Sequence, residues 1–387
     1  MRALGGVQKE RDFAIPIALG CVAAGGGAIG LSFPLLALNL DDWGVSETGI
    51  GLFTLAAALS TVIATPFIPG LLGRIGTRQA LAWALSSVAL AFVGYWLFPS
   101  IAAWVVCRFI AGAAFSVLFV SCEAWALERA PPEKRGLIMG AFASTFAGAM
   151  AGGGALIALL GHVGPLPFLM GAGIAGLGLL LLVLPAKAPS APHGASARPQ
   201  ALLARIAAAP VVMLAPLAMG AIETAKYNLI PIFARRVELG DEIGAMMVTA
   251  AGLGVLVMQP FLGMLADRIG VRPALSLCAL VGIGAPLTIA AAGNAPLLVL
   301  GLMFAYSGIV TGLYTVGLVW LARRFQGAEL AAGNAAFALS YGVGQVLGPA
   351  LAGAAFGSFG PWGFMIALAS MPAMYLAAIV LTRARAA

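Results

Sequence analysis

The fold is decided by PFLGMLADRIGVRPAL at residues 260–275 together with a second copy, PFIPGLLGRIGTRQAL, at residues 66–81. A shift of 194 residues aligns the two copies without a gap, and nine of their sixteen positions are identical. Pro66 pairs with Pro260, and Arg78 pairs with Arg272. The agreement is far beyond chance, so the chain contains an internal duplication whose period is about half its length of 387 residues.

The sequence around these copies is apolar almost throughout. Hydrophobic residues make up 61% of the chain and charged residues only 9%, whereas a soluble domain carries about 25% charged residues. The mean hydropathy is +1.03. So few charges cannot coat a 39.1 kDa particle in water. The composition excludes an ordinary soluble protein and indicates that lipid surrounds most of the chain.

Charges and Pro/Gly clusters divide the chain into apolar runs long enough to cross a bilayer, which takes about 20 residues. The predicted spans are residues 13–38, 46–71, 79–98, 101–127, 137–160, 165–184, 208–233, 243–265, 273–292, 295–321, 330–355 and 361–381. They predict an all-α membrane protein with twelve transmembrane helices and no separate soluble domain. The first run has no cleavage site after a short apolar core, so we expect it to be retained.

The distribution of Lys and Arg predicts the orientation. Loops on one side hold only Arg235 and Arg236, and they also hold several acidic residues. Seventeen of the 21 cations fall on the other side: Arg2, Lys9, Arg11, Arg74, Arg78, Arg129, Lys134, Arg135, Lys187, Arg198, Arg205, Arg268, Arg272, Arg323, Arg324, Arg383 and Arg385. Because cytoplasmic loops carry the excess of Lys and Arg, we expect a multi-pass protein of the cytoplasmic (inner) membrane with both termini inside. The net charge of +7 then reflects topology rather than nucleic-acid binding.

The Pro-, Ala- and Ser-rich stretch 185–207 lies at the midpoint of the chain and has the composition of a linker. It predicts an N-terminal six-helix half at 1–184, a cytoplasmic linker at 185–207 and a C-terminal six-helix half at 208–387. Duplicated six-helix halves with a solute site between them are the architecture of a secondary transporter.

The second copy of the repeat resembles the loop signature of the major facilitator superfamily, G-x-L-x-D-R-x-G-x-R, without a break. The matching residues are Gly263, Leu265, Asp267, Arg268, Gly270 and Arg272. This resemblance covers nearly the whole chain and implies the fold of that superfamily, two pseudo-symmetric halves of six helices each.

The first copy keeps Arg74, Gly76 and Arg78 but has Pro69 and Gly73 in place of the leading Gly and the Asp. The interactions that this signature loop makes are therefore expected to be weakened or replaced in the N-terminal half. Gly can permit close helix approach, Asp can cap a helix N-terminus, and the Arg pair can bond acidic groups or C-terminal carbonyls of the other half.

Further residues extend the resemblance. Arg108, followed by Gly112 and Ser116, resembles the R-x-x-x-G pattern of the family's fourth span. The stretches 123–125 and 229–234 resemble the YcaD-type branch. Glu123 lies four residues from the cytoplasmic end of its span, and we expect it to act as a gate that pairs with Arg74 or Arg78 when the inner side is closed.

Three ionisable residues lie deep inside predicted spans, where a charge costs at least about 2.5–3.5 kcal/mol. Arg108, Glu223 and Lys226 share one depth, roughly 11–18 Å from the outer ends of their helices. In the superfamily the first, fourth, seventh and tenth spans line the cavity, so the resemblance places these charges around one aqueous cleft. Glu223 between two cations could carry a proton. The alternative is that Glu223 and Lys226, three residues apart, only neutralise each other.

The three charges sum to +1, which an anionic or carboxylate-bearing solute would balance. Other polar and aromatic residues of the same spans are candidates for shaping the pocket: Ser32, Phe33, Asn39, Tyr227, Asn228, Tyr306 and Tyr314.

These features favour a secondary active transporter that moves a small organic solute by alternating access and is coupled to protons. One alternative is a proton-driven exporter of amphipathic, drug-like compounds, and another is a non-transporting receptor or scaffold. The sequence has no Walker motif, no nucleophile elbow and no Cys/His/Asp cluster, so we expect no enzyme, no metal and no cofactor. The expected partners are a small-molecule substrate and lipid, and the expected state is a monomer.

Overall fold

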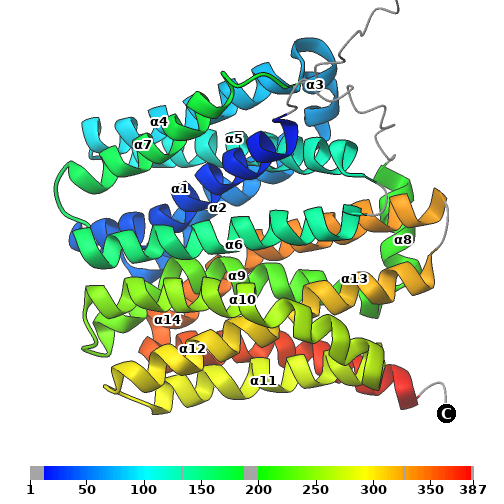
Figure 1. Cartoon of the computed structure of the whole chain (residues 1–387). Coiled ribbons are helices and arrows are strands. Elements are labelled where there is room, and N and C mark those ends of the chain that lie inside the picture. The colour runs from blue at the N-terminus through cyan, green and yellow to red at the C-terminus, as the bar shows by residue number, and fades with distance from the viewer. Residues whose placement is uncertain (1–12, 132–133, 187–198, 326–327, 385–387) are drawn as a thin grey trace, which may run out of the picture.

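In the computed structural model the described residues, 13–131, 134–186, 199–325 and 328–384, form a bundle of long helices joined by short loops (Figure 1). No strand occurs within these ranges. The helices are α1 (Ala14–Asp42), α2 (Glu47–Ala64), the 3-10 turn η1 (Thr65–Phe67), α3 (Ile68–Ile75), α4 (Thr77–Leu97), α5 (Ile101–Arg129), α6 (Arg135–Leu160), α7 (Leu166–Leu181), α8 (Pro199–Ala208), α9 (Pro210–Arg236), α10 (Asp241–Ile269), α11 (Val271–Ala291), α12 (Pro296–Val310), α13 (Gly312–Arg324) and α14 (Ala328–Ala384).

Nine helical stretches of the described chain are long and apolar enough to cross a membrane. One of them lies in α14, which is two helices that meet at Gly360, where φ is 64° and the backbone is not helical. The apolar helix α7 is shorter, at 16 residues. Helix α9 has the length of a span but carries Glu223 and Lys226 in its apolar stretch. With these helices included, the bundle contains the twelve predicted spans.

Local sequence explains where several helices begin and bend. The Ser46 and Ser100 hydroxyls accept bonds from Gly49 N and Ala103 N, which caps α2 and α5. The second span bends at η1, directly before the Pro-containing start of α3. The tenth span is interrupted at Thr311, between α12 and α13.

The two repeat copies form tight helical corners rather than open loops. Gly76 alone separates α3 from α4, and Gly270 alone separates α10 from α11. Their φ angles are +79° and +89°, a region that residues with a Cβ rarely adopt. The signature glycines that the two copies share therefore have a backbone reason.

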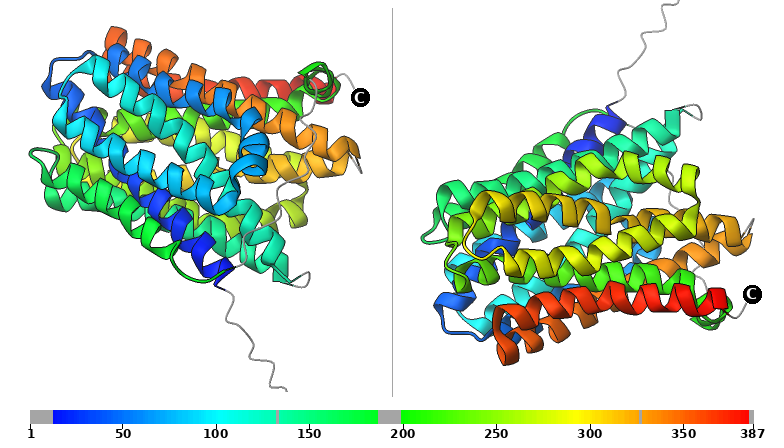
Figure 2. Two further views of the ribbon diagram at one scale, coloured as in Figure 1. Left: turned by 90° about the horizontal axis from the view of Figure 1, so that it is seen from above. Right: turned by 90° about the horizontal axis from the view of Figure 1, so that it is seen from below.

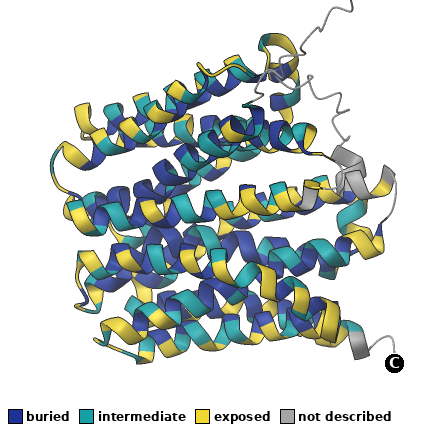
Figure 3. Cartoon of the chain, in the orientation of Figure 1, coloured by how far each residue is buried: buried dark blue, intermediate teal, exposed yellow. Residues whose placement is uncertain are grey.

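Helices α1–α7 form one half of the bundle and α9–α14 form the other, as the blue-to-green and green-to-red parts of Figure 1 show. Helices α1 and α9 begin the two halves and are mostly buried (Figure 3). The halves meet where α2 packs on α14 and α6 packs on α10. Small residues permit these contacts: Gly51 lies against the Pro349 carbonyl, and Gly252 lies against Ala151.

The long helices run between the same two ends of the bundle (Figure 2). We call the end with the loops 43–46, 98–100, 161–165, 237–240 and 292–295 the Asp41 end, and the opposite one the Arg78 end. None of these loops exceeds five residues. The Arg78 end holds the helical corners and α8.

The segment predicted as a linker is partly helical, a detail that its composition did not predict. Residues 187–198 lie outside the described part, but Pro199–Ala208 form α8. This segment has better helix formers than the Pro/Ser-rich residues before it, and Pro199 stands in its first turn. Ile206 packs on the apolar cluster around Phe325, and Arg205 pairs with Glu329 at 2.9 Å. The boundaries at 184 and 208 stay a prediction.

Candidate functional site

Arg108 joins the two halves in the centre of the bundle. It comes from α5 and is only 6% exposed. One guanidinium nitrogen donates to Ser32 Oγ on α1 at 2.9 Å, and another donates to Asn228 Oδ1 on α9 at 3.2 Å. The guanidinium also lies 5.7 Å from the centre of the Phe33 ring. Its Nε has no hydrogen-bond partner. The cation is therefore held by neutral groups, and its Nε–H donor is unused.

Lys226 is a second cation that neutral groups hold in the interior. It is 0% exposed, and its Nζ donates to Ser307 Oγ on α12 at 2.5 Å. The ammonium lies 4.3 Å from the Tyr227 ring centre and 5.9 Å from that of Tyr306. The Tyr227 ring stacks on Phe33 at 5.3 Å, which connects Lys226 to the surroundings of Arg108. The hydroxyls of Tyr227 and Tyr306 are buried without a partner.

Glu223 faces a different neighbour. Its Oε2 accepts a bond from the hydroxyl of Tyr341 on α14 at 2.6 Å. The Tyr341 ring contacts Tyr314 on α13, with 5.3 Å between the ring centres. All three residues are partly exposed, unlike Lys226. The carboxylate therefore lies at the edge of the central cluster and within reach of water.

The alternative that Glu223 and Lys226 only neutralise each other predicts, in its simplest form, a direct ion pair between them. The structure differs from this prediction. Lys226 points to Ser307 and Glu223 points to Tyr341, so the two side chains bond to different helices rather than to each other. Each charge has its own hydroxyl partner, which explains why spacing alone does not bring them into contact.

Most of the predicted pocket residues come together, and one does not. The residues around the two cations are Ser32, Phe33, Tyr227, Asn228 and Tyr306. Tyr314 contacts Tyr341, the hydrogen-bond partner of Glu223. Asn39 is separate. Its side-chain nitrogen donates to the carbonyls of Leu35 and His162 at the Asp41 end.

Sequence reasoning missed Ser307 and Tyr341. Ser307 follows Tyr306 directly, and Tyr341 stands with Ser340 and Gln345 in an otherwise apolar span, which is the available signal. Hydroxyl-bearing residues are common in membrane helices, so the signal becomes specific only when a partner is known.

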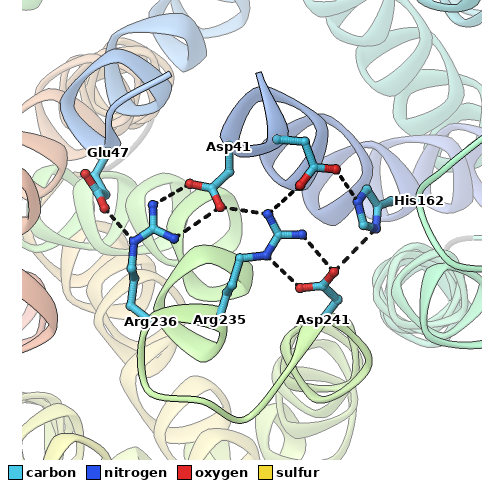
Figure 4. A network of polar contacts seen from close by, with 7 residues as sticks. Asp41, Glu47, His162, Arg235, Arg236 and Asp241 are labelled. Carbon is cyan, nitrogen blue, oxygen red and sulfur yellow. Dashed lines mark hydrogen bonds and ion pairs between the residues drawn. The ribbon is translucent and has the colours of Figure 1, made fainter. Parts of the chain in front are cut away.

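A charged network closes the Asp41 end (Figure 4). The Arg235 guanidinium on α9 forms two bonds to Asp241 at 2.7 and 2.8 Å. It also donates to Asp41 and Asp42 of the other half, both at 2.7 Å. Arg236 pairs with Asp41 and with Glu47, the latter at 2.9 Å. The network joins α1 and α2 of one half to α9 and α10 of the other.

This network was also missed, although its charges are plain in the sequence. Residues 39–45, between the first two predicted spans, include acids and no cation, while residues 234–242, between the seventh and eighth predicted spans, include both arginines. In the sequence these charges predict only the orientation. Their complementarity across the halves is the signal that could have found the closure.

Arg78 has a different partner from the one expected of the signature. Its guanidinium donates to the carbonyls of Leu182, at 2.8 Å from Nε, and also of Leu184 and Ala186. These carbonyls follow the C-terminus of α7 in the same half rather than the other half. The reason is local: α4 packs on α7, so the nearest unpaired carbonyls belong to that neighbour.

The other signature residues lie at the exposed Arg78 end. Arg272 covers the Trp320 ring at 5.4 Å. Asp267 is exposed and lies 3.8 Å from Arg323 of the same half, so it does not cap a helix here. Arg268 is exposed. A Cβ at Gly263 would meet nothing within 4 Å, so close helix approach does not explain this glycine in the observed state.

The predicted gate at Glu123 is not formed in this conformation. Glu123 and Arg74 are both exposed, and Arg78 is occupied at the end of α7. In alternating access the two ends open in turn. Because ion pairs close the Asp41 end, we expect the gate at the opposite end to be open in this conformation. The pairing of Glu123 with Arg74 or Arg78 stays a prediction for the other state.

Two six-helix halves that enclose a polar site and close at one end define a secondary transporter rather than an enzyme. Comparison with protein families matches the Major Facilitator Superfamily at residues 17–245 and again at 227–387. The chain belongs to the major facilitator superfamily, and it is a multi-pass membrane protein.

Curated relatives agree with this assignment. The uncharacterized MFS-type transporter YfkF of Bacillus subtilis is 23% identical over 340 residues, with 86% of each chain covered. The uncharacterized MFS-type transporter YcaD of Salmonella typhimurium is 27% identical over 346 residues, with 87% of this chain and 86% of the relative covered. The resemblance to the YcaD-type branch is therefore confirmed.

Solved structures confirm the fold. A mutant of the nucleoside transporter NupG has a TM-score of 0.80 at 13% identity and covers 95% of this chain and 99% of its own. A D-xylose–proton symporter has a TM-score of 0.70 at 15% identity, with coverages of 95% and 96%.

Proposed function

We propose that this transporter carries a small organic anion, one that bears a carboxylate or a similar group, by alternating access coupled to protons. The observation that carries the proposal is the pair of buried cations, Arg108 and Lys226, whose hydrogen bonds go to neutral oxygens. A buried cation without an anionic partner is costly. A bound anion would supply that partner and use the free Nε of Arg108.

Glu223 supports the proton-coupled part of the proposal. It is the carboxylate next to the central cations, and its position at the edge of the cluster gives water access to it. Tyr341 can donate to it while it is charged. A carboxylate whose environment changes between two conformations binds and releases protons as the conformation changes.

The closed Asp41 end and the exposed residues of the Arg78 end support an inward-facing state. We propose that the Asp41 end faces the outside and that both termini lie in the cytoplasm, in the cytoplasmic membrane, because loops at the Arg78 end hold most of the Lys and Arg residues. The proposal includes a monomer that works without a cofactor.

The first experiment measures ligand-induced thermal stabilisation of the purified protein with organic anions, organic cations, sugars and amphipathic drugs. We expect an anion to stabilise it. Arg108→Ala should weaken binding of that anion about 30-fold, or about 2 kcal/mol, because it removes charge-assisted bonds from a water-poor site. Arg108→Lys should retain part of the affinity.

The matched control is Arg324→Ala, which removes the same charge from an exposed position at the Arg78 end. It should leave the affinity unchanged. Normal affinity in Arg108→Ala would contradict the anionic substrate and favour the exporter of amphipathic compounds. A purified chain that binds the anion but moves none of it across a vesicle membrane would favour the receptor alternative.

A further inference from the structure

His162 lies where the two halves meet at the Asp41 end (Figure 4). It belongs to the loop between α6 and α7, and its side chain is 9% exposed. Its Nε2 lies 2.7 Å from Asp42 Oδ2 of its own half, and its Nδ1 lies 3.7 Å from Asp241 Oδ2 of the other half. The imidazole ring thus stands between two carboxylates that move apart when the halves separate.

This geometry suits the protonated ring. An ionised carboxylate oxygen only accepts hydrogen bonds, and a neutral imidazole has a single N–H. In the neutral form one ring nitrogen would therefore direct its lone pair towards an acceptor oxygen. The imidazolium has an N–H on both sides, so only the charged form interacts favourably with both carboxylates.

The surrounding charges also favour a cation at this position. Asp41 and Asp42 face the site from α1, and Asp241 faces it from α10. Glu242 lines the same hollow as His162 and Asp241. The Arg235 guanidinium on α9 is shared among the three aspartates, and Arg236 pairs with Asp41 and Glu47. With Glu242 included, five acids therefore stand against two arginines around this end of the bundle. A proton on His162 reduces this excess of negative charge.

We propose that His162 is a proton-binding site that joins the two halves and stabilises the state in which the Asp41 end is closed. Opening removes Asp241 from the ring and leaves only Asp42 beside it. The closed state therefore binds the proton more tightly, and by reciprocity the proton favours the closed state. A hollow of about 360 Å³ beside the ring, between α1, α6 and α10, gives water access to it.

The proposal concerns closure of one end and does not depend on the substrate or on Glu223. Its test is a distance measurement without substrate. Cysteines replace Leu166 in the N half and Leu297 in the C half, which are 50% and 86% exposed near the Asp41 end, and Cys107→Ser removes the partly buried native thiol. Pulsed EPR on spin labels at these sites then gives the populations of short and long distances between pH 8 and pH 5.

We expect the ratio of short to long distances to rise about fivefold as the pH falls through the histidine range. His162→Gln should abolish this response, and the short distance should become less populated at pH 5. His162→Arg, which keeps a positive charge at every pH, should give the short distance throughout. The matched control is His193→Gln, which alters the other histidine of the chain and should keep the full response.

The proposal is overturned if the unsubstituted chain shows no pH response, or if His162→Gln responds as the unsubstituted chain does. Should His162→Gln fail to fold, His162→Arg decides alone, because a pH response that persists with a fixed charge also contradicts the proposal. The distance measurement does not depend on anion binding or transport. Failure of the proposed function can therefore be distinguished from failure of the His162 proposal.

Discussion

Arg108 and Lys226 show how single residues make a charged site in an apolar bundle possible. Each cation is held by a hydroxyl or amide oxygen and an aromatic ring, and each lies beside polar atoms that have no partner. Neutral acceptors stabilise a charge less than a carboxylate does. This difference is the reason why we propose a negatively charged ligand for the site.

At the residue scale we predict that Glu223→Gln abolishes accumulation driven by a pH gradient and leaves exchange at equal concentrations intact. Gln can accept the Tyr341 bond with its side-chain oxygen, so the local geometry is preserved while the titrating group is lost. The measurement is uptake into reconstituted vesicles with and without a pH gradient. Tyr341→Phe, which keeps the carboxylate, should retain uphill transport. A Glu223→Gln protein that still concentrates substrate would place the coupling elsewhere.

The sequence predicted the depth of the central charges but not the direction in which each side chain points. Depth follows from the number of residues to the helix end. Direction depends on how each helix is rotated against its neighbours, which the sequence leaves open. Asn39 was placed in the cavity on this basis, and the structure instead turns it towards the carbonyl of His162. Tyr341 was overlooked for the same reason.

At the scale of elements, the helix crossings depend on glycine. A Cβ on Gly344 would overlap the carbonyl of Leu217, and one on Gly348 would overlap that of Ala221. Both contacts are between α14 and α9. The Gly-x-x-x-Gly-Pro pattern in the eleventh span is therefore a packing motif in this chain.

We predict that Gly348→Ala lowers the free energy of unfolding by about 1–3 kcal/mol, because the opposing atoms belong to backbone and cannot move aside. The measurement is the apparent melting temperature of the purified protein. Gly173→Ala on α7 is the control, since its Cβ would meet nothing within 4 Å. It should leave stability unchanged or raise it slightly. Equal melting temperatures for the two variants would show that the close approach of α14 and α9 at Gly348 does not limit stability.

The apolar runs predicted all twelve spans because a bilayer imposes a length on each helix. They did not predict α8, whose few helix-forming residues were averaged with the Pro/Ser-rich stretch before it. The interruptions at η1 and Thr311 were not predicted either. They leave the hydropathy of a span unchanged, so a reading of apolar runs does not detect them.

On the scale of the whole molecule, the two halves are held together unevenly. Ion pairs gather at the Asp41 end, and the opposite end displays exposed residues such as Glu123 and Arg74. Movement of one half against the other would break the first set of contacts and form a second. The structure thus corresponds to one of two alternating states.

The orientation of the molecule can be tested by labelling cells with an impermeant thiol reagent. We predict that Val163→Cys, which is 73% exposed in the unsubstituted chain at the Asp41 end, reacts in intact cells. Arg74→Cys at the opposite end should react only after the membrane is permeabilised. Cys107→Ser provides the background in both cases. The reverse pattern of labelling would invert the proposed orientation.

The loops at the Asp41 end have at most five residues each, and charged residues at the adjoining helix ends pair with one another. In the proposed orientation these loops and the corner at Gly360 are the connections of the described chain that face the surroundings of the cell. An antibody, a phage or a toxin that recognises protein surface would have few residues to contact there. Its binding site on this chain would have to include residues of both halves. Any such binder would fix the halves against each other, so that recognition from outside and arrest of the transporter would be the same event.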